Sequence, residues 1–240
     1  MKSISSILYY LFFFFTGLVL ISIAGAIWLF TFWWDRRMFI SHAYTQLWSS
    51  FLFFIVPGWK ISVSGKEKIN NKKPHVFVSN HQSEFDIIVV SRIFSHFKWV
   101  SKSEVFKYPI IGWNMRMNRY IELKRGDRKS IVKMIKDCDA NIKNGSSVFI
   151  FPEGTRSLDG LVKKMASGAF VIAQRAKVDI QPIALSGTKD IMLKGDWKLN
   201  FKANVKLKVL DAIPYEHFKN MTTDQLAEMV RETIAANVEN

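Results

Sequence analysis

Apolar residues follow two different patterns along this chain. Residues 7–34 are almost wholly apolar, and no charged residue stands between Ser3 and Trp34. After residue 60, short runs rich in β-branched and aromatic residues alternate with segments whose apolar residues recur at helical spacing. The sequence therefore predicts an N-terminal membrane anchor with an interfacial segment, residues 1–59, followed by an α/β domain, residues 60–240.

The run 7–34 has the length of a membrane helix. As a helix it would extend about 40 Å, more than the roughly 30 Å of hydrocarbon in a bilayer. A secretory signal peptide is the competing interpretation, because Ala24-Gly25-Ala26 loosely resembles a cleavage site. The apolar stretch continues past these residues, which favours an anchor. Whether the helix crosses the bilayer or lies along one leaflet stays open.

Two features after the run concern how the anchor is placed. Arg36 and Arg37 follow it directly, whereas only Lys2 and the amino terminus precede it. This bias favours a cytoplasmic position for the C-terminal domain. A second apolar patch, residues 47–59, is too short to span a bilayer. It is either an interfacial or re-entrant segment or a buried core helix.

The domain is predicted to alternate strands and helices. This order indicates an α/β fold with a central, mostly parallel (mixed) sheet of about seven strands flanked by helices. Thr222 and Gln225 have the spacing of a capping box before the last helix. The predicted strands are residues 60–63, 75–79, 98–101, 120–124, 148–151, 180–186 and 205–210, and the predicted helices are residues 86–94, 130–143, 168–176 and 223–238.

A histidine and an acid follow the predicted strand 75–79. His81 and Asp86 are five positions apart, with Asn80 as a candidate helix N-cap. Imidazole can take up and return a proton near neutral pH, and a carboxylate that accepts its other N–H fixes the tautomer. With His81 in the turn and Asp86 in the early helix, the two side chains can face each other. The same spacing fits an ordinary capping turn.

A second polar turn, residues 152–157 (PEGTRS), follows the predicted strand 148–151. Gly154 permits a positive φ or the close approach of a ligand. Glu153 offers an acceptor, and Arg156 offers a planar fork of donors that suits phosphate. The alternative is a surface turn with a local ion pair.

Two further segments border the same region. Arg125 follows the predicted strand 120–124 and could reach the same cleft, since ligands of parallel sheets bind at the carboxyl ends of strands. Pro182 interrupts the strand-like run 180–186, which indicates a sheet edge, a bulge or a strand start. We expect it to shape the wall of the pocket.

Charge and cysteine content narrow the possible partners. The net charge is +14, and residues 35–240 hold 33 basic residues against 20 acidic ones. A basic surface beside a membrane anchor attracts anionic lipid headgroups. No zinc-ligand spacing or recognition-helix pattern supports nucleic-acid binding. The single cysteine, Cys138, occupies an apolar helical position, predicts a core residue and fits a reducing compartment.

Together these segments resemble the glycerolipid acyltransferases, specifically the bacterial 1-acyl-sn-glycerol-3-phosphate acyltransferases. The family's motif NHxSxxD is intact at residues 80–86, and FPEGTRS is matched in full at residues 151–157. An apolar stretch ending in Arg is similar to residues 121–125, and the fourth motif is similar to Pro182-Ile183. The family's K-x-E-L-F-x-x-P-x-x-G segment resembles residues 102–112. The resemblance covers roughly residues 60–187.

The chain departs from the family pattern at three places. Lys124 stands where the family has an acid, Gln181 stands where it usually has Val, and residues 165–168 read MASG in place of FK-x-G, with Lys163 and Lys164 displaced upstream. His81 and Asp86 are untouched, so the chemistry is little affected. These departures bear on which acceptor the chain prefers.

The resemblance implies a membrane-bound enzyme of phospholipid biosynthesis. It would move a fatty acyl group from acyl-CoA or acyl carrier protein to the 2-hydroxyl of lysophosphatidic acid, giving phosphatidic acid, without metal or cofactor. His81 would be the general base and Asp86 its partner, and the hydroxyl would attack the thioester directly. The implied substrate-binding residues are Arg125 and Arg156 for the phosphate, Glu153 for the glycerol part, and Gly154 and Thr155 of the same turn.

The resemblance also implies a place in the bacterial inner (cytoplasmic) membrane, with the catalytic domain on the cytoplasmic side and the lipid bilayer as partner. Two alternatives remain. The acceptor could be another lysolipid or glycerol 3-phosphate, or the chain could be a non-catalytic membrane tether that binds anionic lipid. Acyl-chain preference, the choice of donor and the oligomeric state are open.

Overall fold

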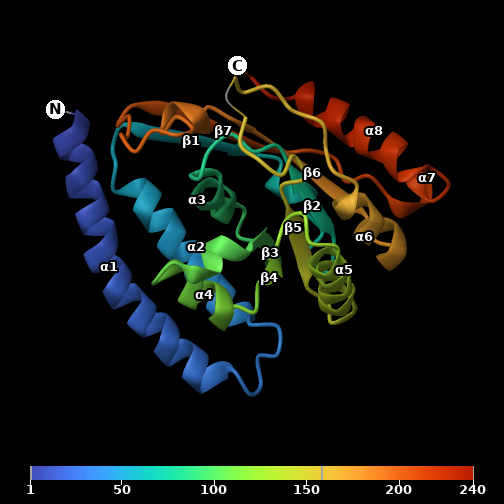
Figure 1. Ribbon diagram of the computed structural model, residues 1–240, viewed down its shortest axis with the longest axis horizontal. Coiled ribbons are helices and arrows are strands. Elements are labelled where there is room, and N and C mark those ends of the chain that lie inside the picture. Colours follow the sequence, from blue (N-terminus) through green and yellow to red (C-terminus); the bar gives the residue numbers. More distant parts are fainter. Residues whose placement is uncertain (1, 158, 240) are drawn as a thin grey trace.

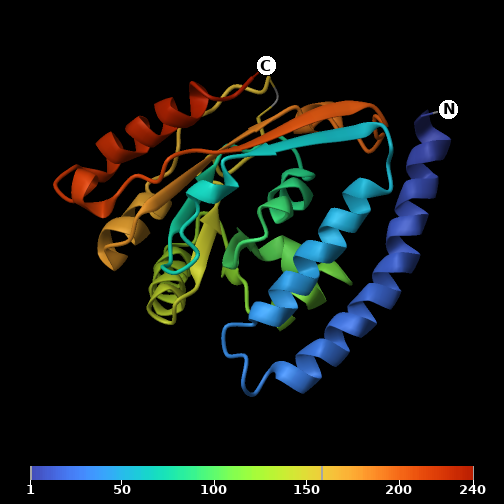
Figure 2. The same ribbon diagram turned by 180° about the vertical axis from the view of Figure 1, so that it is seen from behind.

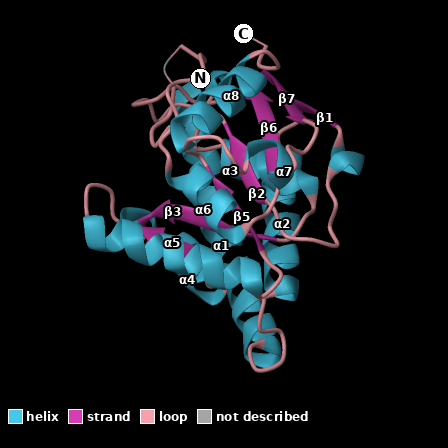
Figure 3. Cartoon of the chain, turned by 90° about the vertical axis from the view of Figure 1, so that its right-hand side faces the viewer, coloured by secondary structure: helices cyan, strands magenta, loops and turns pink. Residues whose placement is uncertain are grey.

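The computed structural model describes residues 2–157 and 159–239. Within them the chain forms one seven-stranded sheet with helices on both faces (Figures 1 and 3). The strands are β1 (Trp59–Ser64), β2 (Val76–Ser79), β3 (Phe97–Lys102), β4 (Ile121–Leu123), β5 (Ser147–Ile150), β6 (Ile180–Ser186) and β7 (Ala203–Val209).

The sheet is mixed and mostly parallel, which confirms the predicted fold class. Its strand order is β1-β7-β6-β2-β5-β3-β4. Strands β6, β2, β5, β3 and β4 pair in parallel, whereas β7 is antiparallel to β6, and β1 pairs in parallel with β7. Because the five parallel strands run in one direction, the turns that follow them meet at one end of the sheet.

The predicted helices are present, and several short ones were not predicted. The helix expected over residues 86–94 is split into α3 and a 3₁₀ segment, and the capping box of Thr222 and Gln225 is confirmed. The helices are α1 (Lys2–Thr31), α2 (Phe39–Phe54), α3 (Asp86–Val90), α4 (Ile111–Met117), α5 (Arg128–Lys143), α6 (Gly168–Ala176), α7 (Tyr215–Phe218) and α8 (Thr223–Ala235), with 3₁₀ segments η1 (Lys66–Lys68), η2 (Ser91–Ile93), η3 (Ser103–Lys107) and η4 (Thr188–Asp190).

Alternate side chains of the central strands enter two separate cores. Val76 and Val78 of β2 pack with side chains of α5, α6 and α8, including the buried Cys138 of α5. Phe77 points to the other face, where it stacks on Phe149 and joins side chains of α2 and α3. Strands covered on both faces are mostly apolar, which explains the nearly continuous apolar runs in the sequence.

Helix α1 lies against α2 and α4 (Figure 2). At Gly17 an added Cβ would lie 3.2 Å from the side chain of Ile110, so this glycine lets the two segments approach closely. Among the described residues, α1 is long and apolar enough to cross a membrane. Its side away from the domain exposes apolar residues that include Ile4, Leu8, Leu11, Phe15, Val19 and Ile23.

The patch 47–59 is largely occupied by α2, which begins eight residues earlier, at Phe39. One side of α2 packs in the core, and the other side is an exposed apolar surface. The buried residues include Trp48, Leu52 and Phe53, and the exposed ones are Phe39, Ile40, Leu47, Phe51 and Phe54.

Polar contacts hold the start of α1, and the loop that follows the helix, to the domain. Near the start, Ser6 Oγ accepts a hydrogen bond from the backbone N–H of Leu199 at 2.8 Å. Just after the helix, the buried Lys98 of β3 donates from Nζ to the carbonyl of Arg37 at 2.7 Å. The helix is therefore fixed along the domain.

Pro182 lies inside β6, between β2 and β7, and not at a sheet edge. The antiparallel pairing of β6 with β7 stops at Ile183, opposite Val209, and a single bridge joins Ile180 to Ile213 beyond it. Residues 181 and 182 thus oppose residues 210–212, which is a bulge. Of the three predicted settings for this proline, the bulge is the one observed.

Gly187, which joins β6 to η4, is predicted to be essential for stability. Its φ is +80°, and an added Cβ would lie 2.1 Å from the carbonyl oxygen of Asn204. Gly187→Ala should lower the free energy of unfolding by more than about 2 kcal/mol, because the left-handed backbone alone costs about 1–2 kcal/mol. Gly126→Ala is the control, since Gly126 has φ +76° and open space around it. Urea unfolding of the full chain in detergent measures both losses, and equal losses would contradict a steric role for Asn204.

Candidate active site

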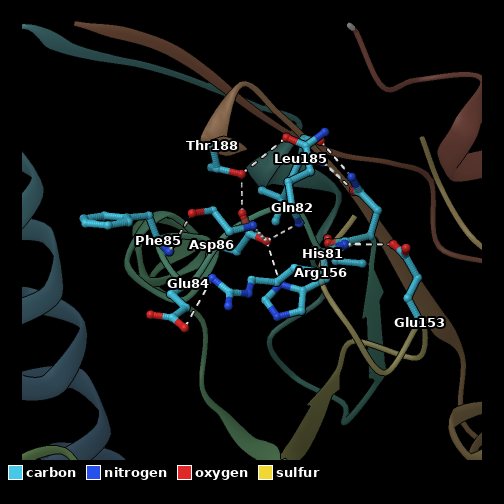
Figure 4. Close-up of polar contacts among 12 residues, drawn as sticks. His81, Gln82, Glu84, Phe85, Asp86, Glu153, Arg156, Leu185 and Thr188 are labelled. Atoms are coloured by element: carbon cyan, nitrogen blue, oxygen red, sulfur yellow. Dashed lines mark hydrogen bonds and ion pairs between the residues drawn. The ribbon is translucent and has the colours of Figure 1, made fainter. Parts of the chain in front are cut away.

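His81 and Asp86 are in direct contact at the carboxyl end of β2. The ring Nδ1 of His81 lies 2.7 Å from Oδ2 of Asp86 (Figure 4). Strand β2 ends at Ser79, residues 80–85 form a turn, and Asp86 is the first residue of α3. The structure thus brings together the two residues that the sequence predicted as a pair.

The carboxylate of Asp86 is completely buried and is surrounded by donors. Its Oδ2 also accepts the backbone N–H groups of Gln82 at 2.7 Å and Ser83 at 3.0 Å. Its Oδ1 accepts a hydrogen bond from the hydroxyl of Thr188 in η4. These donors replace the lost water, and they wrap the turn 80–85 around the carboxylate.

The prediction that Asn80 caps a helix is wrong. Helix α3 begins only at Asp86, and its N-cap position is Phe85. The side chain of Asn80 instead pairs with the backbone of Leu185 in β6, donating from Nδ2 at 2.9 Å and accepting at Oδ1 at 2.8 Å. This amide continues the β2–β6 pairing for one more residue and fixes the start of the turn 80–85.

The backbone of His81 is bound to the turn after β5. Its N–H donates to Oε1 of Glu153 at 2.9 Å, and its carbonyl accepts the N–H of Ser157 at 2.8 Å. Its ring stacks on Phe151, with centroids 4.3 Å apart and planes 17° from parallel. The side chain keeps 17% of its surface exposed. No hydrogen bond joins Nε2 to another residue of the described chain, so this nitrogen is available to a ligand.

Glu153 uses both carboxylate oxygens to hold backbone. Besides the bond to His81, its Oε2 accepts the N–H of Lys163 at 3.1 Å. Burial raises the pKa of Glu153, and the two N–H donors partly oppose this. The structure therefore gives Glu153 a positioning contact with His81 that the sequence did not predict. Its contact with an acceptor stays a prediction.

The predicted arginines lie beside the same turn. Arg156 forms an ion pair with the exposed Glu84, with Nη1 3.3 Å from Oε1 (Figure 4). Gly154 has φ +69°, as its glycine predicted, and a Cβ there would lie 3.9 Å from Cζ of Arg125. Burial lowers the pKa of Arg125 in spite of nearby Glu104. Both guanidinium groups therefore belong to the surroundings of residues 153–157.

Sequence reasoning missed two polar residues of the site. Thr188, which binds Asp86, lies 102 positions from it along the chain. Lys194 donates from Nζ to the hydroxyl of Thr155 at 3.0 Å. Thr188 could have been found, since it follows β6 and the ends of parallel strands meet. For Lys194 the sequence gives no signal, because its loop has no regular pattern.

Comparison with known proteins identifies relatives of this chain. The sequence model of the acyltransferase family matches residues 60–186. The chain is 38% identical over 205 residues to a chloroplastic 1-acyl-sn-glycerol-3-phosphate acyltransferase of Arabidopsis thaliana, covering 85% of this chain and 55% of that protein. It is 34% identical over 143 residues to a 1-acyl-sn-glycerol-3-phosphate acyltransferase of Pseudomonas aeruginosa, covering 58% and 55%. The chain spans 55–59% of the length of its plant and algal relatives.

A solved structure is similar over the whole chain. The 1-acyl-sn-glycerophosphate acyltransferase from Thermotoga maritima matches with a TM-score of 0.81 and 26% identity, covering 99% of this chain and 96% of that one. The resemblance predicted from the four motifs is confirmed, and so is the fold with its apolar N-terminal helix.

The contact between Glu153 and the His81 N–H can be tested by hydrogen exchange. Glu153→Ala should raise the exchange rate of the His81 amide at least about tenfold, because a buried acceptor is lost. The amide of Val78 in β2 serves as the internal control and should keep its rate. An unchanged rate at His81 would contradict the positioning role of Glu153.

Proposed function

The chain belongs to the acyltransferase family, and from that membership we propose that it is a 1-acyl-sn-glycerol-3-phosphate acyltransferase. It transfers a fatty acyl group from acyl-CoA or acyl carrier protein to the 2-hydroxyl of lysophosphatidic acid, and phosphatidic acid is the product. The plant and bacterial relatives and the Thermotoga maritima structure are named as acyltransferases that act on this acceptor, which supports the proposal. The observation that carries the proposal is the His81–Asp86 contact, with Nε2 of the ring left free.

In the proposed mechanism His81 is the general base. Nε2 takes the proton of the acceptor's 2-hydroxyl while the oxygen attacks the carbonyl carbon of the thioester. Asp86 holds the proton on Nδ1 and stabilises the imidazolium that forms. When the C–S bond breaks, the imidazolium returns its proton to the departing thiolate. The acyl group ends on the acceptor oxygen as an ester, and the proton ends on the thiol. The step needs no metal or cofactor.

The acceptor is positioned by the turn after β5. Arg125 and Arg156 bind its phosphate through charge-assisted hydrogen bonds, which brings the 2-hydroxyl to the histidine. Gly154 and Thr155 lie in the same turn and contact the bound acceptor. The stacked ring of Phe151 fixes the plane of the imidazole. Holding the acceptor by its phosphate supplies the proximity that a bimolecular reaction lacks.

The protein also binds the membrane in this proposal, on the cytoplasmic side of a bacterial inner membrane. The exposed apolar side of α1 and the exposed residues of α2 insert into one leaflet. The contacts of Ser6 with Leu199 and of Lys98 with Arg37 support this arrangement over a crossing helix, because they hold the start of α1 and the loop after it against the domain. The basic surplus of the domain adds attraction to anionic headgroups.

The chemical assignment predicts a specific loss of activity. His81→Ala should lower kcat for acyl transfer to lysophosphatidate by about 10²–10⁴-fold, the usual contribution of a general base. Asp86→Asn should also lower kcat, because the ring loses its fixed tautomer. The exposed His217→Ala is the matched control and should retain wild-type activity. The assay uses purified full chain, with thermal unfolding recorded for each variant; wild-type kcat in His81→Ala would exclude its role as base.

The membrane assignment predicts binding that resists salt. The full chain should bind vesicles containing phosphatidylglycerol even in high salt, because apolar contacts are not screened. Replacing the exposed Phe15 and Val19 by Asp should weaken binding more than about tenfold, as each side chain contributes roughly 1.5–3 kcal/mol when buried. Val132→Asp on α5 is the control for an exposed apolar residue elsewhere. Co-sedimentation measures all three, and equal binding by the double variant would contradict insertion of α1.

A further inference from the structure

A closed loop between η4 and β7, residues 191–200, reaches the candidate site. Its ends are joined by the N–H of Asn200 and the carbonyl of Ile191 at 2.8 Å. Ile191 and Leu199 are fully buried, so the base of the loop is fixed in the core. The tip is exposed and carries Lys194.

The ammonium group of Lys194 is held at the turn that carries Arg156. Nζ donates to the hydroxyl of Thr155 at 3.0 Å and to the backbone carbonyl of Arg156 at 3.1 Å. A lysine ammonium has three donors, so one N–H remains for another acceptor. The lysine is thus placed beside Arg156 and has a free donor.

Around the turn that carries Arg156, basic side chains outnumber acidic ones. Lys102 feels the positive charges of Arg125, Arg156 and Lys194. Burial, followed by the charge of Arg125, lowers the pKa of Lys102, and Arg156 and Lys194 add to the effect. Glu84 pairs with Arg156, Glu104 lies near Lys102 and Arg125, and Glu153 of the turn itself is held by backbone N–H groups. This excess of positive charge suits a phosphate monoester, which is close to a dianion above its second pKa of about 6.

Helix α1 fixes the side of the loop away from the site. The hydroxyl of Tyr10 donates to the carbonyl of Trp197 at 2.8 Å, and Ser6 holds the N–H of Leu199 at 2.8 Å. On the inner side, the hydroxyl of Ser83 in the turn 80–85 donates to the carbonyl of Met192 at 3.4 Å. These contacts limit where Lys194 can move.

We propose that Lys194 binds the phosphate of the acyl acceptor together with Arg125 and Arg156, and that it selects a phosphomonoester over a phosphodiester or an uncharged acceptor. This inference rests on the proposed function, of which it names a specificity residue. The third N–H of Lys194 bonds a phosphate oxygen, and its charge completes the surplus that a dianion neutralises. A phosphodiester brings a single negative charge, so these cations attract it less strongly than they attract a dianion.

The test compares Lys194→Met with Lys198→Met. Both substitutions remove a positive charge from the same loop. Lys198 is exposed, and its backbone N–H donates to the carboxylate of Asp196. Lys194→Met should raise KM for 1-acylglycerol 3-phosphate about tenfold and change kcat less than about twofold, because binding common to substrate and transition state is lost. Lys198→Met should change KM less than about twofold. Lys194→Arg should recover most of the affinity, and Lys194→Gln replaces the Met variant if that one unfolds.

A binding experiment separates this inference from the proposed reaction. Equilibrium binding of 1-acylglycerol 3-phosphate in detergent, without acyl donor, should weaken about tenfold in Lys194→Met, and binding of phosphate-free 1-acylglycerol should not change. Equal KM and equal binding in wild type and Lys194→Met would overturn the role of Lys194, as would an equal loss for the phosphate-free lipid. If the wild type binds the phosphorylated lipid through Lys194 but transfers no acyl group, the proposed reaction fails while this inference stands.

Discussion

A carboxylate that is removed from water must be surrounded by donors, and Asp86 obtains its donors from two parts of the chain. Three come from the turn directly before it, as the ring of His81 and the N–H groups of Gln82 and Ser83. The fourth is the hydroxyl of Thr188, after β6. The same carboxylate therefore shapes the turn 80–85, ties it to the segment after β6 and orients the histidine.

The parallel strands make this arrangement possible. Strands β2, β5 and β6 are neighbours and point the same way, so the turns that follow them meet. The turn after β5 supplies Glu153, which holds the backbone of His81, and Phe151, whose ring stacks on its imidazole. The segment after β6 supplies Thr188 and, farther on, the loop with Lys194. Three positions far apart in sequence thus become one site.

Much of the fold could be predicted from two patterns of apolar residues. Mostly apolar runs mark β2, β5 and β6, which are buried on both faces, and alternating residues mark β1 and β7, which are exposed on one face. The long helices follow from helical spacing or from a long apolar run. The short helices α4 and α7 could not be predicted, since four to seven residues give too little periodicity. The sequence also could not show which side of α1 packs against the domain, because the helix is apolar on all sides. Small or polar positions such as Ser6 and Gly17 mark the packed side once the structure is known.

Local geometry predicted one part of the site, whereas Arg125, Glu153 and Arg156 were placed beside it from the family motifs and because the carboxyl ends of parallel strands meet. His81 and Asp86 are five positions apart and lie in one turn, so local geometry was sufficient. Asn80 was misassigned because its amide binds Leu185, 105 positions away, in preference to a nearby helix. Thr188 and Lys194 depend in the same way on how the strands and the loop are placed in space.

The proposed role of His81 as general base depends on which ring nitrogen carries the proton. The tautomer can be read from the ¹⁵N chemical shifts of the imidazole in the full chain, in detergent, with the His81 signals assigned by their loss in His81→Gln. The proposed mechanism requires the neutral ring to carry its proton on Nδ1, toward Asp86, and to keep an unprotonated Nε2. A neutral ring protonated on Nε2 would contradict it, because that nitrogen could not then accept the proton of the acceptor hydroxyl.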